Sequence, residues 1–110
     1  MTDIELRLRA LIDDVERHLQ VASQGAALCA LSRSGHPVNA VKFYEGAWAA
    51  LTAARRQLRA SPDGLDVVLR EWREDLANRQ SVGAHANWIA YCTGGVEYLE
   101  RFRETMQHDA

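Results

Sequence analysis

The chain has 110 residues, of which 47% are hydrophobic and 25% are charged, and its formal net charge is −2. This length allows one hydrophobic core and is short for two, and the balanced composition argues against a disordered chain. The small negative charge excludes a general attraction to nucleic-acid phosphates or anionic membranes. We therefore expect one folded domain over residues 1–110.

The sequence favours a cytoplasmic protein. It shows no basic segment leading into an apolar run, as a secretory signal would, and no stretch near the roughly 18 apolar residues of a membrane span. Cys29 and Cys92 are far apart in the sequence and lack zinc-type neighbours. Both are expected to be reduced core residues. Abundant alanine, and arginine in place of lysine, suggest a GC-rich bacterial genome.

The first predicted helix begins near Thr2 and Glu5, whose spacing matches a capping box. Apolar residues then recur every three or four positions, as on one face of a helix: Ile4, Leu8, Leu11, Val15, Leu19, Ala22 and Ala26. Residues 32–37 are predicted to form a loop. Pro37 is expected to be the first residue of the next helix, where its missing N–H is harmless.

The second predicted helix covers about residues 37–60 and is apolar on two lines. One line carries Val41, Tyr44, Trp48 and Leu51, and the other carries Phe43, Ala47, Ala50 and Ala54. Such a wide apolar arc has two explanations. Either this helix is the most enclosed one of the fold, or its second line contacts another subunit, where alanines allow a close approach.

Two further helices complete the chain. Ser61 as N-cap and Pro62 as first helical residue predict the start of the third, and its apolar line consists of Leu65, Val68, Leu69, Trp72 and Leu76. Residues 80–83 form either a short turn or a kink in one continuous helix. The fourth helix, about residues 84–106, carries apolar side chains on two adjoining lines. They are Trp88, Tyr91, Gly95, Tyr98 and Phe102 on one, with Ile89, Cys92, Val96 and Leu99 beside them.

No alternating strand pattern or Asn-Gly hairpin is present, so the predicted class is all-α, a compact up-down-up-down four-helix bundle. The three tryptophans are expected to fill its centre. Gly94 and Gly95 weaken the fourth helix. They indicate close packing of a neighbouring helix, a kink or space for a ligand. We expect close packing, with Gly46 on the facing helix.

Arg79 and His85 are the candidate catalytic residues. Each lies on the apolar side of its predicted helix, and a turn between them would place both at one end of the bundle. Their spacing resembles the Arg, four-to-six residues, His pattern of the HEPN ribonucleases, which are small helical bundles. The resemblance implies a dimer that cleaves RNA without metal, in which the histidine moves a proton and the arginine holds the phosphate.

This seven-residue resemblance departs from the family pattern at one position, and the two residues also have an alternative, structural explanation. Gln80 stands where the family usually has Asn, Asp or His. In the alternative, Arg79 extends into solvent at a helix end, and His85 makes a local hydrogen bond at the start of the fourth helix.

We predict no cofactor and no metal. A di-iron bundle needs glutamates three residues before histidines, and no histidine here has one. Arg55, Arg56 and Arg59 cluster at the end of the second helix. There they either balance the helix dipole or form a patch for a phosphate or an acidic partner.

These features predict a non-enzymatic protein-interaction or regulatory module that associates with itself or with another protein, and not with a membrane. The candidate partner face is the line formed by Phe43, Ala47, Ala50 and Ala54. The alternative is a HEPN-like ribonuclease using Arg79 and His85, the only interpretation with a nucleic-acid partner. A third is a small-molecule pocket lined by Trp48, Trp88 and Tyr91.

Overall fold

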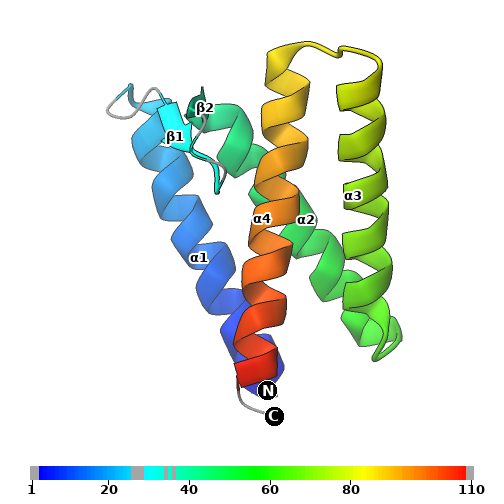
Figure 1. The fold of residues 1–110 in the computed structure, drawn as a ribbon. Coiled ribbons are helices and arrows are strands. Elements are labelled where there is room, and N and C mark those ends of the chain that lie inside the picture. The colour runs from blue at the N-terminus through cyan, green and yellow to red at the C-terminus, as the bar shows by residue number, and fades with distance from the viewer. Residues whose placement is uncertain (1–2, 26–28, 34, 36, 109–110) are drawn as a thin grey trace.

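A computed structural model describes residues 3–25, 29–33, 35 and 37–108 of the chain. Four helices dominate it: α1 (Asp3–Ser23), α2 (Ala40–Ala60), α3 (Gly64–Ser81) and α4 (Ala86–His108). Two short strands, β1 (Cys29–Leu31) and β2 (Pro37–Asn39), lie between α1 and α2 (Figure 1). The predicted all-α, four-helix class is confirmed.

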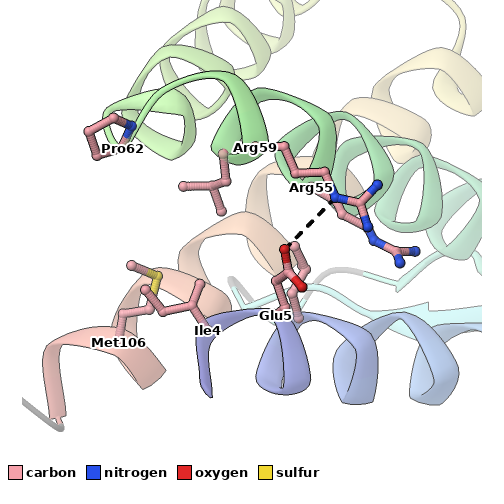
Figure 2. Close-up of a pocket in the computed structure, with 8 residues that line it drawn as sticks. Ile4, Glu5, Arg55, Arg59, Pro62 and Met106 are labelled. Atoms are coloured by element: carbon pink, nitrogen blue, oxygen red, sulfur yellow. Dashed lines mark ion pairs between the residues drawn. The ribbon is translucent and has the colours of Figure 1, made fainter. Parts of the chain in front are cut away.

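Helices α2 and α4 form the largest helix–helix contact of the fold, and α1 and α3 both pack against α2 as well as against α4. Helices α3 and α4 form an antiparallel hairpin, whereas α2 crosses α4 obliquely in Figure 1. In a regular up-down-up-down bundle the helix axes are nearly aligned and the chain direction alternates. The axis of α2 departs from this alignment. The start of α1 lies beside the end of α4, where Arg7 Nη1 donates a hydrogen bond to the Thr105 carbonyl at 3.0 Å. The end of α2 lies near both (Figure 2).

The β-hairpin corrects the prediction that residues 32–37 are only a loop and that the chain has no strand. Strands β1 and β2 pair antiparallel, with Cys29 opposite Asn39 and Leu31 opposite Pro37. Each strand has three residues, too few for an alternating pattern to be recognised. Pro37 therefore lies in a strand, and α2 begins at Ala40. Its N-cap is Asn39, whose side chain accepts the Lys42 N–H at 3.0 Å.

Other helix ends also differ from the prediction. Helix α1 ends at Ser23, and Thr2 and Ala26 lie outside the described residues. Helix α3 begins at Gly64, because Ser61 serves as the C-cap of α2, where its N–H bonds to the Gln57 carbonyl. The turn between α3 and α4 is confirmed. Gly83 adopts φ +65° there, a conformation that glycine takes at little cost.

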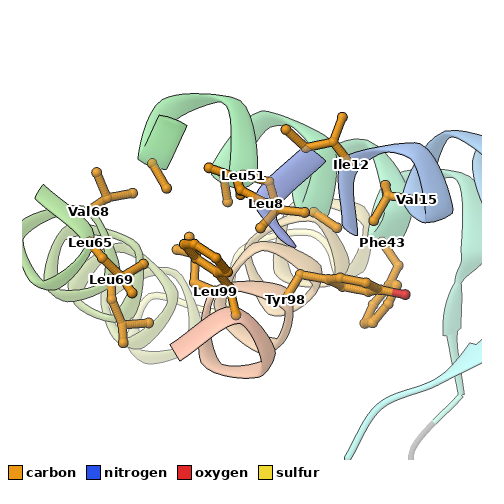
Figure 3. Close-up of a cluster of buried hydrophobic side chains, with 14 residues drawn as sticks. Leu8, Ile12, Val15, Phe43, Leu51, Leu65, Val68, Leu69, Tyr98 and Leu99 are labelled. Carbon is orange, nitrogen blue, oxygen red and sulfur yellow. The ribbon is translucent and has the colours of Figure 1, made fainter. Parts of the chain in front are cut away.

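The core lies between the four helices and contains no tryptophan (Figure 3). Its largest fully buried side chains are Tyr98, Phe43 and Phe102. The prediction of a tryptophan-filled centre is wrong, since Trp48 is 42% exposed and Trp88 is 54% exposed. Smaller core residues come from every helix: Leu8, Ile12, Val15, Ala47, Ala50, Leu51, Ala54, Leu65, Val68, Leu69 and Leu99.

Helices α2 and α4 approach closely through two glycines. A Cβ atom on Gly46 would overlap the backbone carbonyl of Tyr91, and one on Gly94 would overlap that of Phe43. The expected close packing of Gly94 against a helix that carries Gly46 is thus confirmed. The backbones of α2 and α4 are in contact here, and Trp72 from α3 is the tryptophan that packs against the core, with its ring beside Gly95.

Candidate functional site

The structure places Arg79 and His85 near the turn that joins α3 and α4, as their spacing predicts. Arg79 lies in the last turn of α3, where its Nε contacts Asp75 Oδ2 at 3.2 Å. Its guanidinium also lies 4.9 Å from the centre of the Trp88 ring. His85 directly precedes α4, and its Nδ1 accepts the Asn87 N–H at 3.0 Å.

Both side chains are therefore held by neighbours. Within the described part of the chain, no hydrogen bond or ion pair joins Arg79 to His85. The contact that His85 makes is the local one of the alternative interpretation. A phosphate at Arg79 would have to compete with Asp75 for the guanidinium.

The candidate partner face on α2 is inside the protein. Phe43, Ala47, Ala50 and Ala54 are at most 2% exposed, and the chain's own helices cover them. The wide apolar arc of α2 had two explanations, an enclosed helix or a contact with another subunit. The burial of these four residues agrees with the enclosed helix. The expectation that these four residues contact another subunit is wrong, because they offer almost no accessible area.

Exposed aromatic side chains instead gather on another face of the molecule. We call Trp48 from α2 with Trp88 and Tyr91 from α4 the aromatic surface. Trp48 and Tyr91 border a hollow of about 580 Å³, lined by Glu16, Leu19, Gln20, Glu45, Trp48, Ala49 and Tyr91. A second hollow, of about 420 Å³, is lined by Lys42, Glu45, His85, Asn87, Trp88 and Tyr91. The two hollows share Glu45 and Tyr91, so they adjoin.

Contacts with neighbouring side chains hold these rings in place. Trp48 Nε1 donates a hydrogen bond to Glu16 Oε1 at 3.1 Å, which links α2 to α1. The Tyr91 ring stacks on Trp72 with centroids 5.6 Å apart, and it meets Trp88 edge-to-face at 6.1 Å. Rings fixed in this way lose little conformational entropy when a partner binds.

Charges of both signs border the aromatic surface. Lys42 Nζ and Glu45 Oε1 are 3.4 Å apart on the first turns of α2. Burial, and to a lesser degree the Glu45 carboxylate, raise the pKa of the Tyr91 phenol. Tyr91 therefore stays protonated near neutral pH and keeps a hydroxyl that can donate a hydrogen bond.

The third alternative, a small-molecule pocket lined by Trp48, Trp88 and Tyr91, is not found in the bundle centre, where the described core side chains pack together. The three residues are brought together, but around open hollows at the surface and not in the bundle centre. The helical pattern located the aromatic residues correctly on their helices. It could not show which side of α2 and α4 the other helices leave uncovered.

Glu97 is a notable residue that the sequence analysis missed. It is 6% exposed on α4, and its Oε1 accepts the Arg33 N–H at 2.6 Å. Its Oε2 has no hydrogen-bond partner among the described residues. Its place between Val96 and Tyr98 on an apolar stretch of α4 was the available signal. The Arg33 contact shows that Glu97 attaches the β-hairpin to α4.

A third hollow lies at the opposite end of α2 from Asn39. Its volume is about 500 Å³, and it is lined by Ile4, Glu5, Leu8, Arg55, Leu58, Arg59, Pro62 and Met106. It contains Arg55 and Arg59, two members of the predicted arginine cluster. In Figure 2, Ile4 and Met106 lie on one side of it, and Glu5 and the arginines lie on the other.

The described residues contain no group of three or more side chains suited to holding a metal ion. None of the four helices, as far as they are described, has the length and apolar character to cross a membrane. Comparison of the chain with protein-family models, curated proteins and solved structures finds no match.

Proposed function

We propose that this protein is a non-enzymatic interaction module that self-associates through the aromatic surface. The supporting observation is the exposure of Trp48 and Trp88 beside Tyr91, in a protein whose phenylalanines are buried. Tryptophan and tyrosine are enriched at the centres of protein interfaces, where they contribute much of the binding free energy. Their fixed positions here reduce the cost of ordering them on association.

A second copy of the chain is the partner that the charges favour. A two-fold interface brings one patch against the same patch of the other copy, so the patch must be complementary to itself. Lys42 lies on the same face as Glu16 and Glu45. Lys42 of each copy would then face a glutamate of the other. The net charge of −2 gives only weak repulsion between two copies.

We further propose a cytoplasmic location, in a bacterium as the composition suggests. Cys29 and Cys92 are both free, and Cys29 is exposed. An exposed free thiol is compatible with a reducing compartment.

Size-exclusion chromatography with light scattering, over a dilution series, tests self-association. We expect a monomer–dimer equilibrium that Trp88→Ala weakens by about 2 kcal/mol or more, the range of an interface hot spot. Trp88 is more than half exposed, so this change should leave the fold intact, as circular dichroism would show.

Leu6→Ser is the matched control, because Leu6 is also about half exposed but lines none of the hollows of the aromatic surface. It should leave the dimer unchanged. A chain that stays monomeric at the highest concentration, or a Leu6→Ser chain that dissociates as readily as Trp88→Ala, would contradict the proposal.

A further inference from the structure

The hollow at the end of α2 combines an apolar lining with two arginines and a single carboxylate, that of Glu5. Ile4 and Leu8 from α1, Leu58 from α2 and Met106 from α4 supply the apolar part. Ile4 is 42% exposed, although its neighbour Leu8 in the lining is buried. A volume of about 500 Å³ lies within the range of roughly 300–1,000 Å³ found for small-molecule sites.

The arginines at this hollow are poorly neutralised. Arg59 Nε is 3.9 Å from Glu5 Oε1, near the limit for an ion pair (Figure 2). Arg55 has no ion pair or hydrogen bond among the described residues. An adjoining hollow of about 480 Å³ is lined by Thr52, Arg55, Arg56, Arg59 and Ala60, with no acidic residue.

The helix dipole accounts for only part of this arrangement. Cations near the carboxyl end of α2 are favourable because they oppose the negative end of its dipole. That effect acts on any cation near the helix end. It does not require two guanidinium groups to border an apolar hollow formed by three helices.

We propose that this hollow binds a free medium-chain acyl carboxylate. The hydrocarbon chain would lie against Ile4, Leu58 and Met106, where it leaves water. The carboxylate would accept charge-assisted hydrogen bonds from Arg55 and Arg59, whose planar guanidinium groups match its geometry. An inorganic anion would leave the apolar lining unused, and an alkylamine would meet two arginines against the one carboxylate of Glu5. This site is separate from the aromatic surface and does not depend on self-association.

Isothermal titration calorimetry with decanoate, below its micelle-forming concentration, tests the proposal on the full chain. We expect one decanoate per chain, and binding weakened about tenfold or more in Arg55→Gln, since hydrogen bonds between charged groups are the strong ones. Arg56→Gln is the matched control. Arg56 is on the same helical turn but does not line the apolar hollow, so this variant should bind as the unchanged chain does.

One further ligand, one further variant and a vesicle-binding assay complete the test. Decylammonium has the same chain and the opposite charge, and it should not bind. Trp88→Ala should bind decanoate normally even if it no longer dimerises, so the two proposals can fail independently. Equal losses in Arg55→Gln and Arg56→Gln, equal binding of decylammonium, or binding only to anionic lipid vesicles and not to dissolved decanoate would overturn the assignment.

Discussion

At the scale of single residues, the two cysteines show how position determines chemistry. Cys92 is buried and its Sγ donates to Asp75 Oδ2 at 3.3 Å, whereas Cys29 lies exposed in β1. Burial and then the Asp75 carboxylate raise the pKa of the Cys92 thiol from 9.0 to about 11. The expectation that both cysteines belong to the core is confirmed for Cys92 and wrong for Cys29, because the hairpin was not foreseen.

The shifted pKa of Cys92 predicts a loss of stability in alkaline solution. Between pH 9.0 and about 11 the unfolded chain releases the thiol proton more readily than the folded one. The free energy of unfolding should therefore fall as the pH rises through this interval. Urea unfolding at a series of pH values measures this free energy. In Cys92→Ala the decline should be smaller, and an equal decline in both proteins would contradict the assignment.

Arg79 and His85 allow a second prediction at this scale. Because Asp75 and Trp88 hold Arg79, and the Asn87 N–H occupies His85 Nδ1, we expect no RNA cleavage that depends on the pair. The purified chain and an Arg79→Ala/His85→Ala double variant, incubated with RNA in the presence of a chelator, should behave alike. Cleavage by the unchanged chain that the double variant lacks would establish the ribonuclease interpretation instead.

At the scale of elements, periodic apolar residues predicted all four helices because each is long enough to show several turns. Their ends were less predictable. Asn39 and Ser61 are both suitable cap residues. Asn39 becomes the N-cap of α2 because the β-hairpin ends there, and Ser61 becomes the C-cap of α2 in the connection to α3. Strands of three residues leave too little pattern to recognise.

The crossing of α2 and α4 predicts that Gly94 tolerates no side chain. Gly94→Ala gains about 1 kcal/mol of helix propensity, but its Cβ would overlap the Phe43 carbonyl. We expect the steric cost, about 1–3 kcal/mol or more, to exceed this gain, so that urea unfolding shows a less stable protein.

Gly95→Ala is the matched comparison on the same helix. Its Cβ would meet the ring of Trp72, a half-buried side chain that has more freedom to move than a backbone carbonyl. The loss should be smaller than in Gly94→Ala. A Gly94→Ala protein as stable as the unchanged chain would show that the two helices can separate without cost.

At the scale of the whole molecule, the fold class followed from the sequence, whereas the sites depend on tertiary placement. Trp48, Trp88 and Tyr91 could be named as a group, but their position at the surface depends on which sides of α2 and α4 the other helices leave uncovered. Similarly, Arg55 and Arg59 form an evident cluster in the sequence. The apolar hollow beside them requires Ile4 and Met106, which come from opposite ends of the described chain.

The hydrogen bond between Arg7 and Thr105 has a consequence for protein engineering. Since the start of α1 and the end of α4 meet at one end of the molecule, the segment from Asp3 to His108 enters and leaves the fold at neighbouring points, which is the geometry that insertion into a surface loop of a carrier protein requires. The same geometry would suit a circular permutant of this segment, with new termini at the exposed turn around Gly83.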